Sequence, residues 1–120
     1  ILRKNNIRVS LFIEPCIRDI KISYMLGANC VELHTGNFCN LFNKGKNTEN
    51  SYLKLKKSAD FAKSNGLEVH AGHGLTYESL KEISKINSIS EFNIGHFIVS
   101  ESIFIGLKKV ITNFRKIINN

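Results

Sequence analysis

The sequence predicts an α/β fold of four strand–helix units with parallel strands, arranged as half of an eight-stranded barrel. Strand-like and helix-like runs alternate along the chain with no hairpin signal between them, which predicts parallel pairing through right-handed crossovers. The strands carry polar residues on one face only, whereas strands of the alternative, a small open sheet, are apolar on both faces. A complete barrel needs about 250 residues, so the 120 residues present suffice for half of one.

The first unit is expected between Arg8 and Gly27, after a segment 1–7 that resembles the tail of a preceding helix. That segment indicates a chain that begins inside a longer protein. Alternation predicts a strand from Arg8 to Glu14, whose apolar face holds Val9, Leu11 and Ile13. Pro15 suits the first turn of the next helix, because its missing N–H costs nothing there. Gly27 ends that helix. Its core-facing positions are Ile17, Ile20 and Tyr24.

The second unit combines a short strand, a long irregular segment and a helix. The strand is expected from Asn29 to His34, with Val31 and Leu33 facing the core. The segment from Thr35 to about Asn50 is rich in Gly, Asn and Lys and predicts a loop; a loop of that length is more often functional or mobile than idle. The following helix ends at Asn65-Gly66. Its apolar stripe consists of Tyr52, Leu55, Ala59 and Ala62.

The third unit contains a clear helix start. A strand is expected from Leu67 to Ala71, and the glycine-flanked His73 follows it. Thr76 suits the N-cap of the next helix, and Glu78 in its first turn is favoured by the helix dipole. The core-facing positions of that helix are Leu80 and Ile83.

The fourth unit is predicted to end in one long helix. A short strand is expected from Glu91 to Ile94, and the helix from about Ser100 onward. The helix has a single apolar stripe of Ile103, Leu107, Val110, Ile111, Phe114, Ile117 and Ile118. Residues 8–120 are therefore predicted to form four βα units of one domain, a partial barrel that spans 1–120.

The formal net charge of +7 is by itself compatible with a nucleic-acid partner or with anionic ligands. Thirteen of the seventeen basic residues are lysines, and this bias, together with abundant Ile and Asn, is typical of an AT-rich genome whatever the function. One group of lysines falls on the outer face of a single predicted helix, without an aromatic stacking platform: Lys54, Lys56, Lys57 and Lys63. A solvated face is favoured, and no nucleic-acid partner is predicted.

Membrane association and oxidised cysteines are not predicted either. No apolar run reaches membrane-spanning length, and the first residues do not form a signal-peptide pattern. The three cysteines, Cys16, Cys30 and Cys39, are an odd set without metal-knuckle spacing, so neither a disulfide framework nor a zinc ribbon is indicated. A reduced, cytoplasmic setting fits this usage.

All four histidines fall at or just after the expected C-terminal ends of strands: His34, His70, His73 and His96. In parallel α/β folds, ligands bind and catalysis occurs at that edge. For any one such histidine a buried structural role is about as common as a functional one. His73 is the strongest functional candidate, because its glycine neighbours leave it little packing to do. His70 is the weakest and is compatible with simply filling the barrel.

Two further features indicate a site at the same edge. Glu32 shares a strand face with His34, and a carboxylate there is either functional or paired with a basic residue of a neighbouring strand; both interpretations remain open. Gly95-His96 leads into the last helix, where backbone N–H groups form a natural phosphate cradle. Gly74 and Gly95 would lie in the two loops that often bind phosphate if these are a barrel's last four strands. No metal site is predicted, because no cysteine or carboxylate cluster completes a ligand set.

Four strings stand out along the chain: Val9-Ser10-Leu11-Phe12-Ile13, Glu32-Leu33-His34-Thr35-Gly36, Ala71-Gly72-His73-Gly74-Leu75-Thr76-Tyr77 and Asn93-Ile94-Gly95-His96. Their order and approximate spacing resemble those of the pyridoxine 5'-phosphate synthase family. The chain resembles this family from about Arg8 to its end. The resemblance implies a (βα)8 TIM barrel of roughly twice this length, of which the chain is the C-terminal half.

The resemblance also implies a reaction and a set of roles. The family condenses 3-amino-2-oxopropyl phosphate with 1-deoxy-D-xylulose 5-phosphate to give pyridoxine 5'-phosphate, phosphate and water, without a metal or an organic cofactor. The resemblance also implies that the protein is cytoplasmic and forms a homo-oligomer, namely an octamer. By motif match His73 is the general acid, and Glu32 stabilises the charge of the transition state. Gly74, Gly95 and His96 match positions that hold the amino-ketone phosphate.

The chain departs from the family in two respects. The family's other catalytic histidine and glutamate belong to the barrel half that is absent, so the chain alone is expected to be inactive. Glu101 stands where many relatives carry a basic residue near the phosphate loop. The residues alone leave two alternatives open: another phosphate-binding barrel isomerase or aldolase, and a non-catalytic basic module that binds RNA or a protein.

Overall fold

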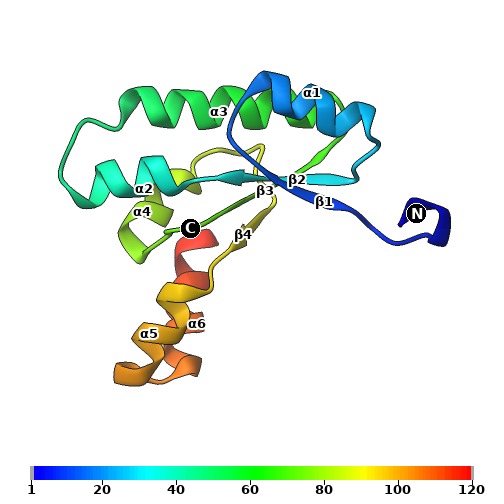
Figure 1. Ribbon diagram of the computed structural model, residues 1–120. Coiled ribbons are helices and arrows are strands. Elements are labelled where there is room, and N and C mark those ends of the chain that lie inside the picture. Colours follow the sequence, from blue (N-terminus) through cyan, green and yellow to red (C-terminus); the bar gives the residue numbers. More distant parts are fainter. Residues whose placement is uncertain (1, 120) are drawn as a thin grey trace.

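The computed structural model describes residues 2–119 and contains one sheet of four parallel strands (Figure 1). The strands are β1 (Ser10–Ile13), β2 (Cys30–His34), β3 (Glu68–Gly72) and β4 (Glu91–Asn93). The helices are the 3-10 helix η1 (Arg3–Asn5), α1 (Ile17–Met25), α2 (Gly36–Asn43), α3 (Glu49–Ser64), α4 (Tyr77–Ile83), α5 (His96–Ile105) and α6 (Leu107–Ile118). The predicted α/β architecture of parallel strands alternating with helices is confirmed.

The order of the strands is the one expected for half of a barrel. β1, β2, β3 and β4 pair in chain order, whereas the order in a doubly wound sheet reverses at a switch point. The described residues do not close a barrel, and β1 and β4 are the two edges of the sheet. Figure 1 shows α1 and α3 side by side along the sheet, and α5 and α6 together beyond β4.

One face of the sheet carries the core. Val31 and Leu33 of β2 and Val69 of β3 are buried in one cluster with residues of α1, α3, α4 and α6. Each buried side chain of this size contributes about 1.5–3 kcal/mol to folding. The predicted core positions of α3 and α4 are confirmed, with Tyr52 partly buried and these residues buried: Leu55, Ala59, Ala62, Leu80 and Ile83.

The opposite face is polar, as predicted, and His70 occupies its centre. His70 is 5% exposed, and its ring has Nε2 2.9 Å from Glu68 Oε1 and Nδ1 3.5 Å from Glu91 Oε1. Glu68 also pairs with Arg8, and these hydrogen bonds from His70 and Arg8 lower the pKa of its carboxyl group. His70 therefore fills this face between acidic partners.

The predicted loop from Thr35 to about Asn50 is wrong over its first half, because α2 forms there. Phe38 and Cys39 are buried on the inner side of α2, and the Phe38 ring stacks on Phe42 with centroids 5.7 Å apart. The glycine and asparagine content of this segment concealed the short helical spacing. Only the residues between α2 and α3 remain irregular.

The prediction of one long last helix is also wrong. The chain is already helical from His96, and Gly106, with φ 81° and ψ 142°, separates α5 from α6. Val110 and Phe114 of α6 are buried, but Ile103 is 79% exposed and Leu107 is 59% exposed. The predicted stripe is therefore divided between two helices, and only part of its α6 portion is buried.

The first unit differs from its prediction in detail. Pro15 precedes the N-cap residue Cys16 instead of lying in the first turn of α1. Ile20 is buried as expected, but Tyr24 is 56% exposed, and Ser23 is buried in its place with its hydroxyl donating to Asp19 O at 2.8 Å. Of the predicted helix tail 1–7, residues 3–5 form the 3-10 helix η1, and Ile1 lies outside the described residues.

The lysines of α3 lie on its exposed side. Lys56 Nζ donates to Asp60 Oδ2 at 2.7 Å, which raises the pKa of Lys56 and lowers that of Asp60. Lys63 Nζ donates to Asn87 O at 3.2 Å. Between residues 2 and 119, no helix has both the length and the apolar character that a membrane crossing requires.

Replacing Gly106 with Ala is expected to lower the free energy of unfolding by about 1–2 kcal/mol, because a Cβ disfavours a positive φ. No neighbouring atom lies within 4 Å of the added Cβ, so the loss comes from the backbone conformation. The matched control is Gly95→Ala, which also meets no atom within 4 Å but has φ −106°. Urea unfolding of both variants measures the difference, and equal losses would contradict the account.

Candidate active site

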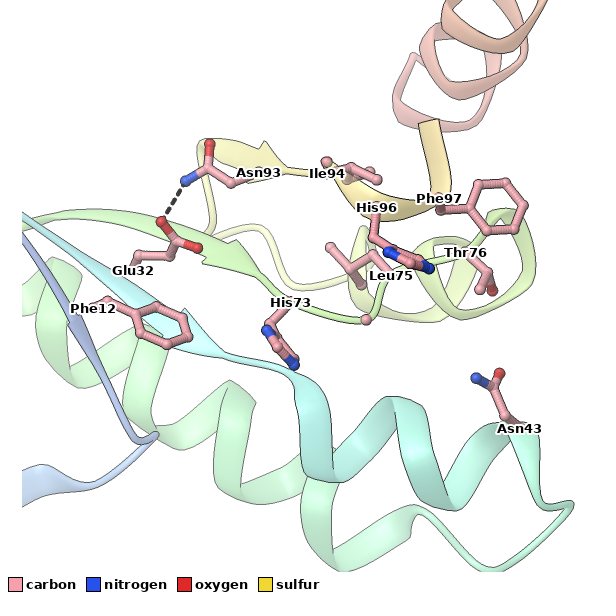
Figure 2. A pocket seen from close by; sticks show the side chains of 12 residues that line it. Phe12, Glu32, Asn43, His73, Leu75, Thr76, Asn93, Ile94, His96 and Phe97 are labelled. Carbon is pink, nitrogen blue, oxygen red and sulfur yellow. Dashed lines mark hydrogen bonds between the residues drawn. The ribbon is translucent and has the colours of Figure 1, made fainter. Parts of the chain in front are cut away.

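A pocket of about 740 Å³ opens at the carboxyl ends of the strands (Figure 2). It is lined by Phe12, Glu32, Asn43, His73, Gly74, Leu75, Thr76, Asn93, Ile94, Gly95, His96 and Phe97. These include all five residues that the sequence predicted for the site: Glu32, His73, Gly74, Gly95 and His96. Segments more than sixty residues apart in the sequence therefore meet in one space of the size of a small molecule. The other two histidines, His34 and His70, do not line this pocket.

His73 and Gly74 form the turn that leaves β3, and both have left-handed backbones, with φ 79° and 81°. For a residue with a Cβ this conformation costs about 1–3 kcal/mol, so it persists only where neighbouring groups hold it. Thr35 is such a neighbour. Its Oγ1 lies 2.7 Å from Gly72 O and 2.7 Å from His73 O, and its backbone N–H donates to Gly72 O at 2.9 Å.

The exposed His73 ring stands beside two other rings. The His34 ring meets it edge to face with centroids 4.6 Å apart, and the Phe12 ring lies 6.5 Å away. His34 is itself held by Glu14, whose Oε1 is 2.7 Å from His34 Nδ1. His34 therefore supports His73 from outside the pocket, while one side of the His73 ring remains open to a ligand.

Glu32 has an amide partner in the pocket. Asn93 Nδ2 donates to Glu32 Oε2 at 2.7 Å (Figure 2). The carboxylate reaches Asn93 across Gly72, where a Cβ would overlap Glu32 Oε1. The sequence left open whether Glu32 pairs with a basic side chain. Among the described residues, Glu32 forms no such ion pair. Its hydrogen-bond partner beside the pocket is therefore a neutral amide instead of a cation.

Two helices begin at the pocket, and their first turns differ. Thr76 caps α4: its Oγ1 accepts from Ser79 N at 3.3 Å, and Ser79 Oγ accepts from Thr76 N at 2.8 Å. This confirms the predicted cap. α5 begins at His96 with Gly95 as its N-cap, which has no side chain to satisfy the first N–H groups. Those N–H groups and the helix dipole favour an anion.

Sequence reasoning missed some of the residues that line the pocket. Asn93 was quoted only as part of a motif, although it lies two strands from Glu32 on the same polar face. Asn43 belonged to the predicted loop and reaches the pocket only because α2 is helical. Strand register would have identified Asn93, but no sequence signal indicated Asn43.

A second group of ionisable side chains lies away from the pocket. Glu68, His70 and Glu91 could hold a metal ion, since one ligand atom of each lies within 4.8 Å of the others. Sequence spacing did not reveal this group, because the carboxylates come from β3 and β4. Glu68 is already paired with Arg8 and His70.

A pocket at the carboxyl ends of parallel strands, in a sheet whose order does not reverse, is characteristic of βα-barrel proteins. The fold and the pocket assign the chain to that class. Comparison with known proteins then identifies one family within it: residues 1–120 match the family described as pyridoxal phosphate biosynthesis protein PdxJ. The chain belongs to this family, and the four βα units match half of its TIM barrel.

Three curated relatives show how much of the barrel is present. The pyridoxine 5'-phosphate synthase of Pelagibacter ubique (strain HTCC1062) is 53% identical over 119 residues, which cover 99% of this chain and 50% of that protein. The synthase of Sulfurihydrogenibium sp. (strain YO3AOP1) is 44% identical over 119 residues, 99% of this chain and 48% of that protein. That of Rhodospirillum rubrum is 45% identical over 114 residues, 95% of this chain and 45% of that protein. The chain spans about half the length of these relatives, consistent with the predicted C-terminal half.

Replacing Gly72 with Ala is expected to displace the Glu32 carboxylate while the sheet stays intact. The new Cβ would overlap Glu32 Oε1 and lie 3.0 Å from Asn93 O, and the flexible carboxylate is the group that yields more easily. Asn93 then loses its acceptor, so its side-chain NH2 resonances should shift in a ¹H–¹⁵N spectrum. Gly95→Ala, whose Cβ meets no atom within 4 Å, should leave those resonances in place. Unchanged Asn93 resonances in Gly72→Ala would show that the carboxylate does not occupy this space.

Proposed function

We propose that the chain provides half of the active site of a pyridoxine 5'-phosphate synthase. The reaction condenses the amine of 3-amino-2-oxopropyl phosphate with 1-deoxy-D-xylulose 5-phosphate and releases pyridoxine 5'-phosphate, phosphate and water. The observation that carries the proposal is the single pocket that collects all five motif residues. The names of the three relatives support it, since each is a pyridoxine 5'-phosphate synthase.

His73 is the proposed general acid. Its ring lines the pocket and is exposed there. An imidazole changes charge near neutral pH, so it can carry a proton to a departing oxygen and be reprotonated between turnovers. Closing the pyridine ring expels water and phosphate, and protonation makes such oxygens better leaving groups. A positioned acid of this kind contributes about 10²–10⁴-fold to the rate.

Glu32 is the proposed stabiliser of transition-state charge. Condensation of an amine with a ketone passes through a positively charged nitrogen, which a fixed carboxylate stabilises. Asn93 holds Glu32 Oε2 at 2.7 Å, so the carboxylate is oriented before the substrate arrives. A preoriented charge pays no reorganisation energy during the reaction.

Gly74, Gly95 and His96 are the proposed binding residues for the amino-ketone phosphate. The uncapped N-terminus of α5 offers backbone N–H groups at Gly95-His96, and the left-handed Gly74 turn faces the same pocket. Backbone donors at a helix N-terminus bind phosphate without a lysine or arginine. Glu101 lies more than one turn into α5, so these donors do not depend on a basic residue at that position.

The proposed enzyme is a complete barrel that uses no metal or organic cofactor. It is proposed to be cytoplasmic and to assemble as a homo-octamer. The chain holds only part of the acid–base set, and it is proposed to be inactive until the other half is present. The open edges of β1 and β4 support this view, because unpaired strand edges recruit other strands.

Inorganic phosphate is expected to bind at the α5 corner of the chain. In a ¹H–¹⁵N titration, the amide resonances of Gly74, Gly95 and His96 should move together with one dissociation constant. Resonances of Lys54 and Lys57 on the exposed side of α3 serve as the internal control and should stay in place. Shifts confined to those lysines, or produced there by RNA, would instead favour a basic binding module.

His73→Asn is expected to lower kcat by about 10²–10⁴-fold with little change in KM, because it removes the acid and keeps a polar side chain. The assay uses a full-length chimera in which residues 1–120 replace the matching half of the Pelagibacter ubique synthase, and it measures formation of pyridoxine 5'-phosphate. The chain without the other half should give no product. Normal turnover by His73→Asn would remove His73 from the mechanism.

A further inference from the structure

Thr35 uses its hydroxyl group in an unusual way. It is fully buried and occupies the N-cap position of α2, where a threonine hydroxyl usually accepts from a backbone N–H of the first helical turn. No such bond forms at α2. Instead Oγ1 lies 2.7 Å from the carbonyl oxygens of both Gly72 and His73, at the end of β3. The start of α2 thus lacks a side-chain cap, because the Thr35 hydroxyl contacts the end of β3 instead.

The two carbonyl groups can meet one hydroxyl only because the chain turns at His73. Successive carbonyls of an extended strand point in opposite directions. The left-handed φ of 79° at His73 brings them to the same side. A residue with a Cβ adopts that conformation only where its surroundings hold it, and the Thr35 hydroxyl contacts both of the peptide groups that flank the turn.

The direction of the His73 ring follows from the same turn. The ring lies against Gly36, the residue after Thr35, where a Cβ would come within 3.0 Å of His73 Cδ2 and 2.7 Å of His34 Nε2. The His34 ring, held by Glu14, packs edge to face against the His73 ring, with ring centroids 4.6 Å apart. If the backbone at His73 relaxed toward an extended conformation, the ring would move away from Gly36 and His34.

We propose that Thr35 is a positioning residue for His73: its buried hydroxyl shares one proton between the Gly72 and His73 carbonyls and so holds the turn with the imidazole ready for proton transfer in the pocket. The inference rests on the proposed role of His73 as the general acid. The Thr35 backbone N–H donates to Gly72 O at 2.9 Å and survives any side-chain substitution. Removing the hydroxyl therefore loosens the turn while β2 and β3 remain paired.

The test compares Thr35→Val, which removes the hydroxyl at nearly constant volume, with Thr35→Ser, which keeps it. In the chimera, Thr35→Val should lower kcat by about 10²-fold at nearly unchanged KM, as expected for a misplaced catalytic group. Thr35→Ser should restore most of the rate. The matched control is Thr48→Val, at the N-cap of α3, which also lacks a side-chain cap bond and does not line the pocket; it should leave kcat unchanged.

A double-mutant cycle separates positioning from general stabilisation. If Thr35 acts through His73, then Thr35→Val should cost nothing further in the His73→Asn background. A 10²-fold loss that persists in that background, or that Thr35→Ser does not rescue, would overturn the proposal.

A measurement on the 120-residue chain keeps this proposal distinct from the proposed function. The ³J(HN,Hα) coupling of His73 reports its φ angle, and it should change in Thr35→Val but not in Thr35→Ser. An inactive chimera with this change in coupling would reject the proposed function and retain the role of Thr35 in holding the turn. An unchanged coupling in Thr35→Val would reject that role whether or not the chimera is active.

Discussion

The register of β2, β3 and β4 decides which side chains meet in the pocket. Parallel pairing sets His34 opposite Gly72 and Gly72 opposite Asn93, so a residue without a side chain lies between two polar ones. Glu32 uses that space to reach Asn93. A slip of one residue would turn these side chains to the other face of the sheet. The buried Val31 and Leu33 oppose such a slip, because it would expose them. Core packing and site geometry are therefore set by the same constraint.

The pocket combines that rigid register with a strained turn and an uncapped helix. The turn at His73 stores conformational energy that the Thr35 hydrogen bonds offset, and the N-terminus of α5 leaves N–H groups available. Both the turn and the helix start belong to the second half of a βα barrel and lie at the carboxyl edge of its strands. β1 and β4 each have an unpaired edge among the described residues, and Phe12 on β1 is 56% exposed although it lines the pocket. The chain thus presents one side of a site.

The periodicity of apolar residues and the positions of glycines were enough to predict four parallel strands and the core stripes of α3 and α4. The residue type at position 76 was enough to predict the Thr76 cap. Periodicity and glycine positions failed at α2, because Asn and Gly residues lowered the helical signal while Phe38 and Cys39 supplied the burial. They also failed at Gly106, since apolar spacing continued across a residue whose φ of 81° interrupts the helix. The five site residues were chosen from glycine neighbours and motif strings, and the pocket brings them together. The contacts of Thr35 with Gly72 and His73 join residues 37 and 38 positions apart, so no local pattern could have revealed them.

The most direct test of the account is a crystal structure of the full-length chimera with bound 3-amino-2-oxopropyl phosphate. Phosphate oxygens are expected within hydrogen-bonding distance of the backbone N–H groups of Gly74 and Gly95-His96. The His73 imidazole is expected on the side of the reacting carbons, with Thr35 still hydrogen-bonded to the turn behind it. A phosphate group bound away from the start of α5, or a His73 ring turned out of the pocket while the ligand is bound, would contradict it.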